Sequence, residues 1–171
     1  NVSSKKIALF LISYPGEWDN IRSLWAEKCR DMNTMPYLVI LPWYNKDYDG
    51  SPMKWHTWSA GDFAEAAGLS DVEEKQILDV KQLTAEYLEL LRPEQIYSQN
   101  PYDEWNPNIS VPPLLYAVNL RKYTEELIYV SPYGKGELYG KNSREYQNMK
   151  YYVTMPGVMY ADRILLNSED K

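Results

Sequence analysis

A short polar loop, Asn100–Trp105, brings two carboxylates and two aromatic rings together in the sequence NPYDEW. Pro101 fixes its own φ and pushes the preceding residue out of the helical region, so this segment is predicted to be a turn. The loop directly follows Glu94–Gln99, which we interpret as a short buried strand. Ligands of open α/β sheets bind beyond the carboxyl ends of the strands, so the loop is a candidate binding site.

The two carboxylates of this loop, Asp103 and Glu104, are candidates for a general base. A carboxylate within about 2.6–3.2 Å of an alcohol can take its proton while the oxygen attacks phosphorus, which contributes about 10²–10⁴-fold to the rate. The alternative is that Asp103 caps its own turn by accepting hydrogen bonds from nearby backbone amides. The sequence alone leaves both interpretations open.

Other reactive side chains are scarce. His56 is the only histidine, and no second His or Cys lies at the spacing of a metal ligand, so we predict no metal site. The single cysteine, Cys29, lies on the apolar stripe of a predicted helix, which favours core packing over a nucleophilic role. One cysteine excludes an internal disulfide and is typical of a reducing compartment, so we expect a cytoplasmic protein. We also expect no cofactor.

The composition fits one domain of ordinary size, with 171 residues and a net charge of −6. This charge argues against non-specific binding to nucleic acid or to anionic membranes, which requires basic patches. No apolar run approaches the roughly 20 residues that span a bilayer. The 16 Tyr and 6 Trp, against 2 Phe, suit a wet cleft or a docking surface better than a dry core.

Continuous apolar runs predict strands at Lys6–Ser13, Tyr37–Trp43, Glu94–Gln99, Leu127–Val130 and Arg163–Asn167. Such runs are typical of parallel strands that are covered on both faces. Helical periodicity predicts Glu17–Met32, Lys81–Leu91, Val111–Tyr123 and a helix that begins at Asn142. Strand and helix alternate, so we predict an α/β fold with a mostly parallel sheet and helices on both faces.

The predicted apolar faces consist of Trp18, Ile21, Trp25, Cys29 and Met32 in the first helix, of Leu83, Tyr87 and Leu90 or Leu91 in the second, and of Val111, Leu114, Leu115 and Val118 in the third. The segment Asn45–Gly68 is the least regular, although alternation around Trp55 indicates a short edge hairpin. Ser70, followed three residues later by Glu73, has the spacing of a capping box and predicts a short helix.

Three loops are predicted strand exits, namely Ser13–Asp19, Asn100–Asn106 and Ser131–Gly136. Successive parallel strands point the same way, so their exit loops share one edge of the sheet. The residues that we expect around one pocket at this edge are Tyr14, Asn100, Asp103 and Tyr133.

The segments YPGEWD (Tyr14–Asp19), WYNKDYDGS (Trp43–Ser51), RPEQIYSQNPYDEWN (Arg92–Asn106), NLRKYTEELIYVSPYGKGE (Asn119–Glu137) and PGVMYADRILLNSE (Pro156–Glu169) carry a family resemblance. They resemble the amino-terminal half of the CDP-glycerol glycerophosphotransferase-like family, which builds teichoic-acid-type polymers on bacterial surfaces. The likeness covers nearly the whole chain in the family's order. It implies a single Rossmann-like domain over residues 1–171, similar to the amino-terminal half of a B-type (GT-B) glycosyltransferase.

The resemblance implies a two-domain transferase whose amino-terminal half receives a polyol-phosphate or glycan acceptor. The carboxy-terminal half of such enzymes holds the CDP-linked donor, so we expect this chain to be the acceptor-side half and to be inactive alone. For the full-length protein we expect a cytoplasmic location, at the inner face of the membrane. The net charge and the absence of a long apolar run predict no nucleic-acid partner and no transmembrane segment. The alternative is a non-catalytic module that binds a glycan or a partner protein on the same fold.

One loop departs from the family pattern. The better-studied polymerases carry a Trp-His-Gly-Thr-Pro-Leu-Lys type loop whose His is thought to serve in catalysis, whereas this chain has Tyr133 in that place and keeps Gly134. A tyrosine pKa of about 10 makes a poor general base at neutral pH, so we assign the catalytic role to Asp103. The predicted substrate-binding residues are Tyr14, Asn100, Tyr102, Tyr133 and Gly134. Trp18 could join them, but its place on the helical stripe favours core packing.

Overall fold

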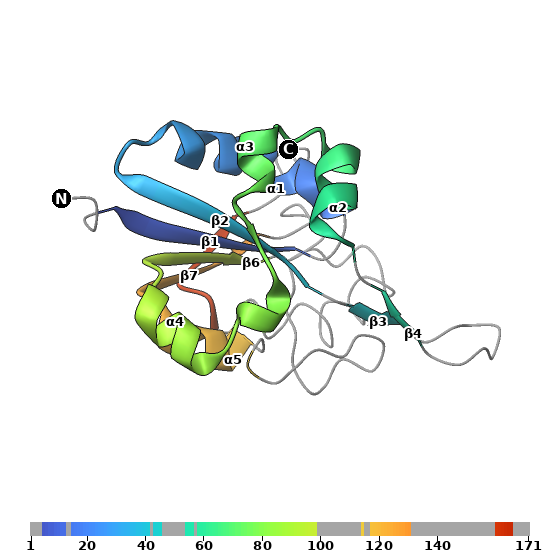
Figure 1. Cartoon of the computed structure of the whole chain (residues 1–171). Helices are drawn as coiled ribbons and strands as arrows, with labels where there is room; N and C mark the ends of the chain where they lie inside the picture. The colour runs from blue at the N-terminus through green and yellow to red at the C-terminus, as the bar shows by residue number, and fades with distance from the viewer. Residues whose placement is uncertain are drawn as a thin grey trace, which may run out of the picture.

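The fold is taken from a computed structural model that describes residues 5–12, 15–41, 43–45, 54–56, 58–98, 114, 117–130 and 160–165. Six strands form one sheet in the order β5-β2-β1-β6-β7-β8 (Figure 1), and every neighbouring pair is parallel. The strands are β1 Lys6–Ile12, β2 Thr34–Ile40, β5 Ile77–Leu78, β6 Gln95–Ser98, β7 Glu126–Val130 and β8 Arg163–Leu165. The predicted parallel sheet is therefore confirmed.

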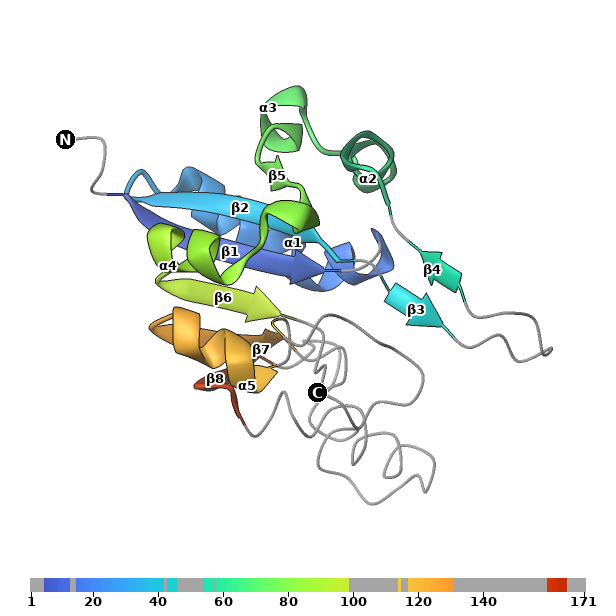
Figure 2. The same ribbon diagram turned by 60° about the horizontal axis from the view of Figure 1, so that its bottom comes forward.

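The helices cover both faces of this sheet (Figures 1 and 2). One face carries α1 (Pro15–Arg30), α2 (Ala60–Ala67) and α3 (Asp71–Glu74). The other face carries α4 (Ala85–Leu91), α5 (Ala117–Leu120) and the 3₁₀ helix η4 (Arg121–Tyr123). The prediction of an α/β fold with helices on both faces is confirmed.

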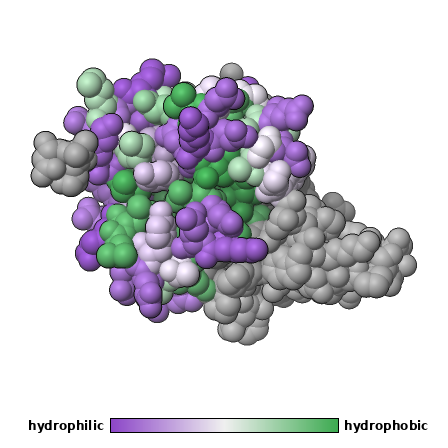
Figure 3. Space-filling model, viewed as in Figure 1, coloured by the Kyte–Doolittle hydropathy of each residue, from purple (hydrophilic) through white to green (hydrophobic). Residues whose placement is uncertain are grey.

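The protein has two hydrophobic cores, one on each face of the sheet, and strand β1 contributes to both. Successive side chains of a strand point to opposite faces, and both faces of β1 are covered. Leu9 is buried in a cluster with Leu88 of α4, whereas Phe10 is buried in a second cluster with Trp25 of α1. Leu78 is half-buried against the first cluster. Figure 3 shows apolar surface in the middle of that view with polar side chains around it.

The path of the chain through the sheet is that of a doubly wound fold. From β1 the chain moves to β2 and then to β5 on one side, with α1, α2 and α3 on the same face. It then returns to the other side of β1, where β6, β7 and β8 follow in order. This arrangement is Rossmann-like, and the direction of winding reverses between β1 and β6.

The predicted apolar face of α1 is correct at Trp18, Ile21 and Trp25, which are buried, and wrong at its end. Cys29 is exposed rather than packed in the core. Met32 is 86% exposed, because α1 ends at Arg30 and helical periodicity no longer applies to the turn that follows. At this end of the helix Lys28 lies over the Tyr97 ring, with its Nζ 5.9 Å from the ring centre. The side of α1 that carries Lys28, and not the side that carries Cys29, therefore faces the sheet here.

The predicted helix Lys81–Leu91 is wrong in its first half. The chain forms a 3₁₀ helix, η2 (Val80–Gln82), and only then α4. Asp79 caps η2 and Thr84 caps α4, since each side-chain oxygen accepts a hydrogen bond from a backbone N–H of the following turn, at 2.9 and 3.1 Å. Such caps stabilise a new helix start and therefore divide the segment. Leu90, one of two residues that the periodicity offered for the buried face, is 85% exposed.

The segment Asn45–Gly68 holds more structure than predicted. The hairpin is present, and its strand β4 (Lys54–His56) pairs antiparallel with β3 (Trp43–Asn45), so β2 ends before Trp43. Helix α2 was not predicted. Ser59 begins it by accepting a hydrogen bond from a backbone N–H of its first turn at 3.1 Å, and Gly68 ends it in the left-handed conformation, with φ 73. Strand β5, with only two residues, was also missed.

Other local predictions have mixed outcomes. The capping box is confirmed, because Ser70 and Glu73 exchange hydrogen bonds between side chain and backbone at 3.1 and 3.2 Å. The predicted helix Val111–Tyr123 is helical where α5 and η4 are described, but Val118 is 38% exposed. The helix predicted to begin at Asn142 lies outside the described residues.

Arg92 ends α4 in the left-handed conformation, with φ 46 and ψ 62. It is the one non-glycine residue with positive φ in the described part of the chain. Its N–H donates a hydrogen bond to the Leu88 carbonyl at 2.8 Å, and its side chain is exposed. An L-residue in this conformation costs about 1–2 kcal/mol, whereas glycine adopts it without a Cβ clash.

We expect Arg92→Gly to raise the free energy of unfolding by about 0.5–1 kcal/mol, since it relieves the strain at the end of α4 and loses part of that gain to chain entropy. Urea unfolding of the 171-residue chain measures the change. Arg92→Ala is the control, because alanine removes the same side chain and keeps the strain. A glycine variant no more stable than the alanine variant would contradict the prediction.

Candidate functional site

The carboxyl ends of β1, β6 and β7 lie side by side at one edge of the sheet. Leu11 pairs with Ser98, and Ser98 pairs with Tyr129, so β1 and β7 each end one residue beyond this row. Figure 2 shows the three arrowheads pointing the same way and ending close together. The strand ends therefore meet as predicted. This edge, at the reversal of winding between β1 and β6, is the candidate site.

The six predicted site residues themselves lie outside the described part of the chain, namely Tyr14, Asn100, Tyr102, Asp103, Tyr133 and Gly134. Ile12, Ser98 and Val130 are the last residues of the strands from which their loops depart. The structure thus gives the starting points of the three segments at one edge, and the predicted loop Ser13–Asp19 is wrong from Pro15 onward, because α1 begins there. The shared pocket and the roles of the six side chains stay predictions.

The described residues at this edge form a buried and mostly apolar floor. Ile12, Leu41 and Val130 are at most 4% exposed, and Ser98 is the one buried polar residue in the described core, at 6%. Interactions between charges are stronger above an apolar floor than in bulk water, because the local dielectric constant is lower. A carboxylate or phosphate held at this edge would therefore interact more strongly with neighbouring charges than it would in bulk water.

Trp18 is part of the core rather than of this edge's accessible surface. It is 2% exposed, and its ring meets those of Trp25 and Phe63 edge-on, with centroids 5.7 and 6.0 Å apart. Edge-to-face pairs at these distances stabilise a core beyond the area they bury. The preference for core packing over a role in an acceptor groove is confirmed.

Glu94, in the motif RPEQIYS, organises the opposite, amino-terminal edge of the sheet. Its carboxylate forms an ion pair with Lys6 at 3.1 Å, and its backbone N–H donates to the Ile7 carbonyl at 2.9 Å. Its carbonyl accepts hydrogen bonds from the Glu126 N–H at 2.9 Å and from the Thr124 hydroxyl at 3.1 Å. Glu94 thus joins β1, β6 and β7, which is a structural role that its sequence motif alone did not reveal.

Asp162, in the motif PGVMYAD, fixes the start of β8 against β7. One carboxylate oxygen accepts a hydrogen bond from the Leu127 N–H at 2.8 Å, and the other forms an ion pair with Arg121 at 2.9 Å. The Asp162 N–H also donates to the Leu127 carbonyl at 2.8 Å. Two motifs of the family resemblance therefore meet at this carboxylate, and their interaction positions a strand rather than a substrate.

Tyr97 is a polar side chain whose surroundings make it a poor acid or base. Its ring stacks on Phe10 at 4.6 Å, and its hydroxyl donates a hydrogen bond to Gln95, which in turn donates to Glu126 at 2.8 Å. Burial raises the pKa of the Tyr97 hydroxyl, and the nearby Lys28 opposes this only in part. The hydroxyl therefore stays protonated at neutral pH.

Cys29 is exposed, and its thiol is not activated. Burial of part of the side chain, together with the Glu73 carboxylate, raises the pKa of this thiol, and Arg30 lowers it by less. A raised pKa reduces the thiolate fraction, and the thiolate is the nucleophile. The prediction that Cys29 is no nucleophile is supported, although the prediction that it fills the core is wrong.

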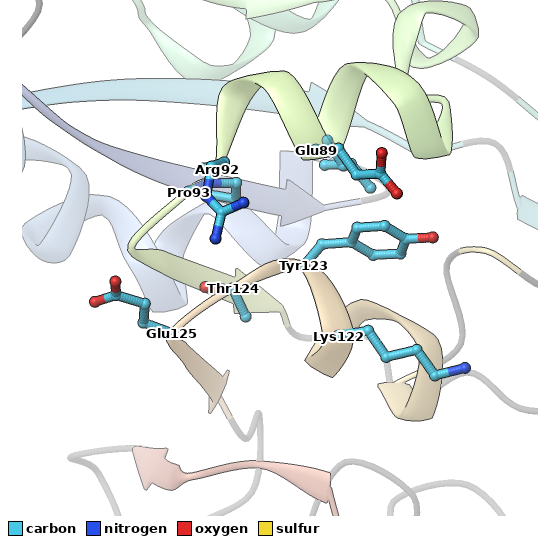
Figure 4. A pocket seen from close by; sticks show the side chains of 8 residues that line it. Glu89, Arg92, Pro93, Lys122, Tyr123, Thr124 and Glu125 are labelled. Carbon is cyan, nitrogen blue, oxygen red and sulfur yellow. The ribbon is translucent and has the colours of Figure 1, made fainter.

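A small hollow of about 130 Å³ lies at the amino-terminal edge, between the end of α4 and the start of β7 (Figure 4). Its lining includes two acids, Glu89 and Glu125, and two bases, Arg92 and Lys122. Sites for drug-sized ligands usually measure about 300–1,000 Å³. This hollow is smaller, its charges balance, and it lies opposite the candidate site.

Comparison of the chain with profiles of protein families, with curated proteins and with solved structures gave no match. Among the described residues, no three His, Cys, Asp or Glu side chains lie close enough together to hold a metal ion. None of the described helices is long and apolar enough to cross a membrane. The features that bear on function are therefore the motifs, the topology and the edge at which three strands end.

We expect Asp162→Ala to lower the free energy of unfolding by about 1–3 kcal/mol, because it leaves the Leu127 N–H and the Arg121 guanidinium without their partner. Asp162→Asn should cost less, since it keeps an acceptor for Leu127 and loses only a partly exposed ion pair, which contributes about 0–1 kcal/mol. Urea unfolding measures both changes, with Glu125→Ala, at an exposed position nearby, as control. Equal stability of all three variants would show that Asp162 does not fix β8.

Proposed function

We propose that the chain is the acceptor-side half of a CDP-glycerol glycerophosphotransferase-like enzyme for a teichoic-acid-type cell-surface polymer. The observation that carries the proposal is the meeting of β1, β6 and β7 at the reversal of winding. The segments YPGEWD, NPYDEW and SPYGKG, which carry the family resemblance, follow the strand ends at Ile12, Ser98 and Val130, and from Pro15 onward the first of them is the start of α1. A Rossmann-like sheet with its ligand at this edge is the arrangement that such a transferase requires.

In the proposed reaction a primary alcohol of the acceptor attacks the phosphorus that bears glycerol in CDP-glycerol. The new oxygen–phosphorus bond forms as the bond to the cytidine monophosphate group breaks, and that group leaves with the bonding electron pair. Asp103 takes the proton of the alcohol. Tyr14, Asn100, Tyr102, Tyr133 and Gly134 surround the acceptor.

The donor and its phosphate charges belong to the partner domain in this proposal. Stabilisation of developing charge is usually the largest contribution to such catalysis, so the isolated acceptor half is inactive. We place the full-length protein in the cytoplasm, at the inner face of the membrane, where a lipid-linked acceptor and a soluble donor can meet. The single cysteine is compatible with that compartment.

A second candidate function is a non-catalytic module that binds a glycan or a partner protein at the same edge. The presence of Tyr133 where the family has its catalytic His favours it. The two functions differ in what the neighbouring polypeptide must supply, because only the transferase needs a second βαβ domain that binds CDP-glycerol.

We expect Asp103→Ala to cut transfer by the full-length protein about 10²-fold or more, the usual effect of losing a general base, while the domain stays folded. Asp103→Asn is the matched control, because it keeps an oxygen that can cap the turn and removes the base. Transfer of labelled glycerol phosphate to the acceptor and thermal unfolding are measured together. A variant that unfolds at a markedly lower temperature but stays active when folded would support the capping role instead.

The 171-residue chain should bind CDP-glycerol weakly or not at all, because the donor's phosphates are held by the other domain. Isothermal titration calorimetry measures this directly, with the full-length protein as positive control. Micromolar affinity of the isolated chain would contradict the proposed division between the two halves.

A further inference from the structure

A groove of about 440 Å³ lies between α1 and the segment formed by α2 and α3. Its size is within the range of about 300–1,000 Å³ that is usual for small-molecule sites. The groove is in the helical layer on one face of the sheet, and its described lining comes from α1, from α2 with its cap, and from α3, not from the strand ends of the candidate site. Ligand binding in this groove therefore does not require the proposed transferase activity.

The floor of this groove is a rigid aromatic cluster. Trp18 and Trp25 are 2% and 1% exposed, and both belong to the core on that face. The Trp25 indole N–H donates a hydrogen bond to Glu73 at 2.7 Å, which ties α1 to α3. Buried rings that are held in this way keep the floor in place whether or not a ligand is present.

The walls of the groove are built from small residues. Ala26 comes from α1, and Ala66, Ala67 and Gly68 come from α2 and its cap. A Cβ added at Gly68 would meet no atom within 4 Å, so the space above this residue is open. Small side chains leave room for an apolar body of ligand size against the helices.

The charges around the groove are mainly negative. Among the described residues that line it, Glu65 and Glu73 are acidic, and the one base, Arg22, forms an ion pair with Asp19 at 3.2 Å. Glu65 is exposed. Burial raises the pKa of Glu73, but hydrogen bonds from the Ser70 backbone, the Trp25 indole and the Ser70 hydroxyl lower it by more, so this carboxylate is ionised at neutral pH. A carboxylate has about four lone-pair sites, so Glu73, which accepts hydrogen bonds from Trp25 and Ser70, can still accept one from another donor.

We propose that this groove binds a small organic cation with an apolar body, whose ammonium group lies between Glu65 and Glu73 and whose body lies against the alanines of α2. The apolar floor and the small walls accept the body, and the two carboxylates select the positive charge. A neutral molecule of the same shape lacks the second interaction and binds more weakly.

The test is an NMR titration of the 171-residue chain with 2-phenylethylamine at pH 7, observing the indole N–H signals of Trp18 and Trp25. We expect saturable shifts of both signals, and weaker binding of the neutral analogue 2-phenylethanol. Glu65→Gln should weaken amine binding by a factor of about two to five, the size of an exposed charge pair. Glu89→Gln, which removes the same charge from α4 on the other face, should leave it unchanged.

A second variant tests the space itself. Ala66 is exposed, so Ala66→Trp should leave the fold intact by circular dichroism while it fills the groove and abolishes the saturable shifts. Three results would overturn the proposal: no saturable shift with the amine, equal affinity for amine and alcohol, or equal effects of the Glu65 and Glu89 variants. Unchanged binding by a folded Ala66→Trp chain would place the ligand elsewhere and overturn it as well.

Discussion

The pairing of β1 with both of its neighbours is the constraint on which the rest of the structure depends. All seven residues of β1 pair with β2, and four of them also pair with β6. The strand is covered on both faces, so its side chains supply the centre of both cores. Full burial of a Leu or Phe contributes about 1.5–3 kcal/mol relative to exposure. A shift of one residue would exchange the two faces and misplace every neighbouring helix.

The two edges of the sheet have different tasks. At the amino-terminal edge, polar groups form hydrogen bonds and ion pairs that join strands. Glu94 joins β1, β6 and β7 in this way, and Asp162 joins β7 and β8. At the carboxyl edge, the described strand ends are buried and mostly apolar, so polar groups have to come from the loops. This difference explains why residues of one family-like motif divide between structural and candidate functional roles.

The long strands were predictable because a short, continuous apolar run fits few structures other than a buried strand. The meeting of strand ends followed from winding rules, which need only the order of strands and helices. Short elements were not predictable in the same way. The two-residue strand β5 has no pattern of its own, and α2 is indicated only by Ser59 and Gly68 at its ends. Periodicity identifies the face of α1 but not where the face stops being covered, so Cys29 and Met32 were misplaced.

The candidate site was predictable only as far as the backbone determines it. The end of a strand is fixed by its ladder, whereas the direction of a loop carboxylate depends on local turn geometry and distant neighbours. Asp103 can therefore be a cap or a base on the same sequence. Tyr97 shows the same limit in a described case. Its stacking on Phe10 follows from the pairing of two strands that are remote in sequence, and its contact with Lys28 follows from the packing of α1 on the same face.

The reversal of winding between β1 and β6 also has a kinetic consequence. β1 meets β2 across a single helix, but it meets β6 only after the hairpin, α2, α3, β5 and α4 have been traversed, with Ala8 opposite Gln95. Long-range parallel pairing requires the closure of a large loop before any contact compensates for it, and it is slow for that reason. We therefore expect the pairing of β1 with β6 to form later in folding than the pairing of β1 with β2. The edge at which we place the candidate site would then be completed only when these two halves of the sheet have joined.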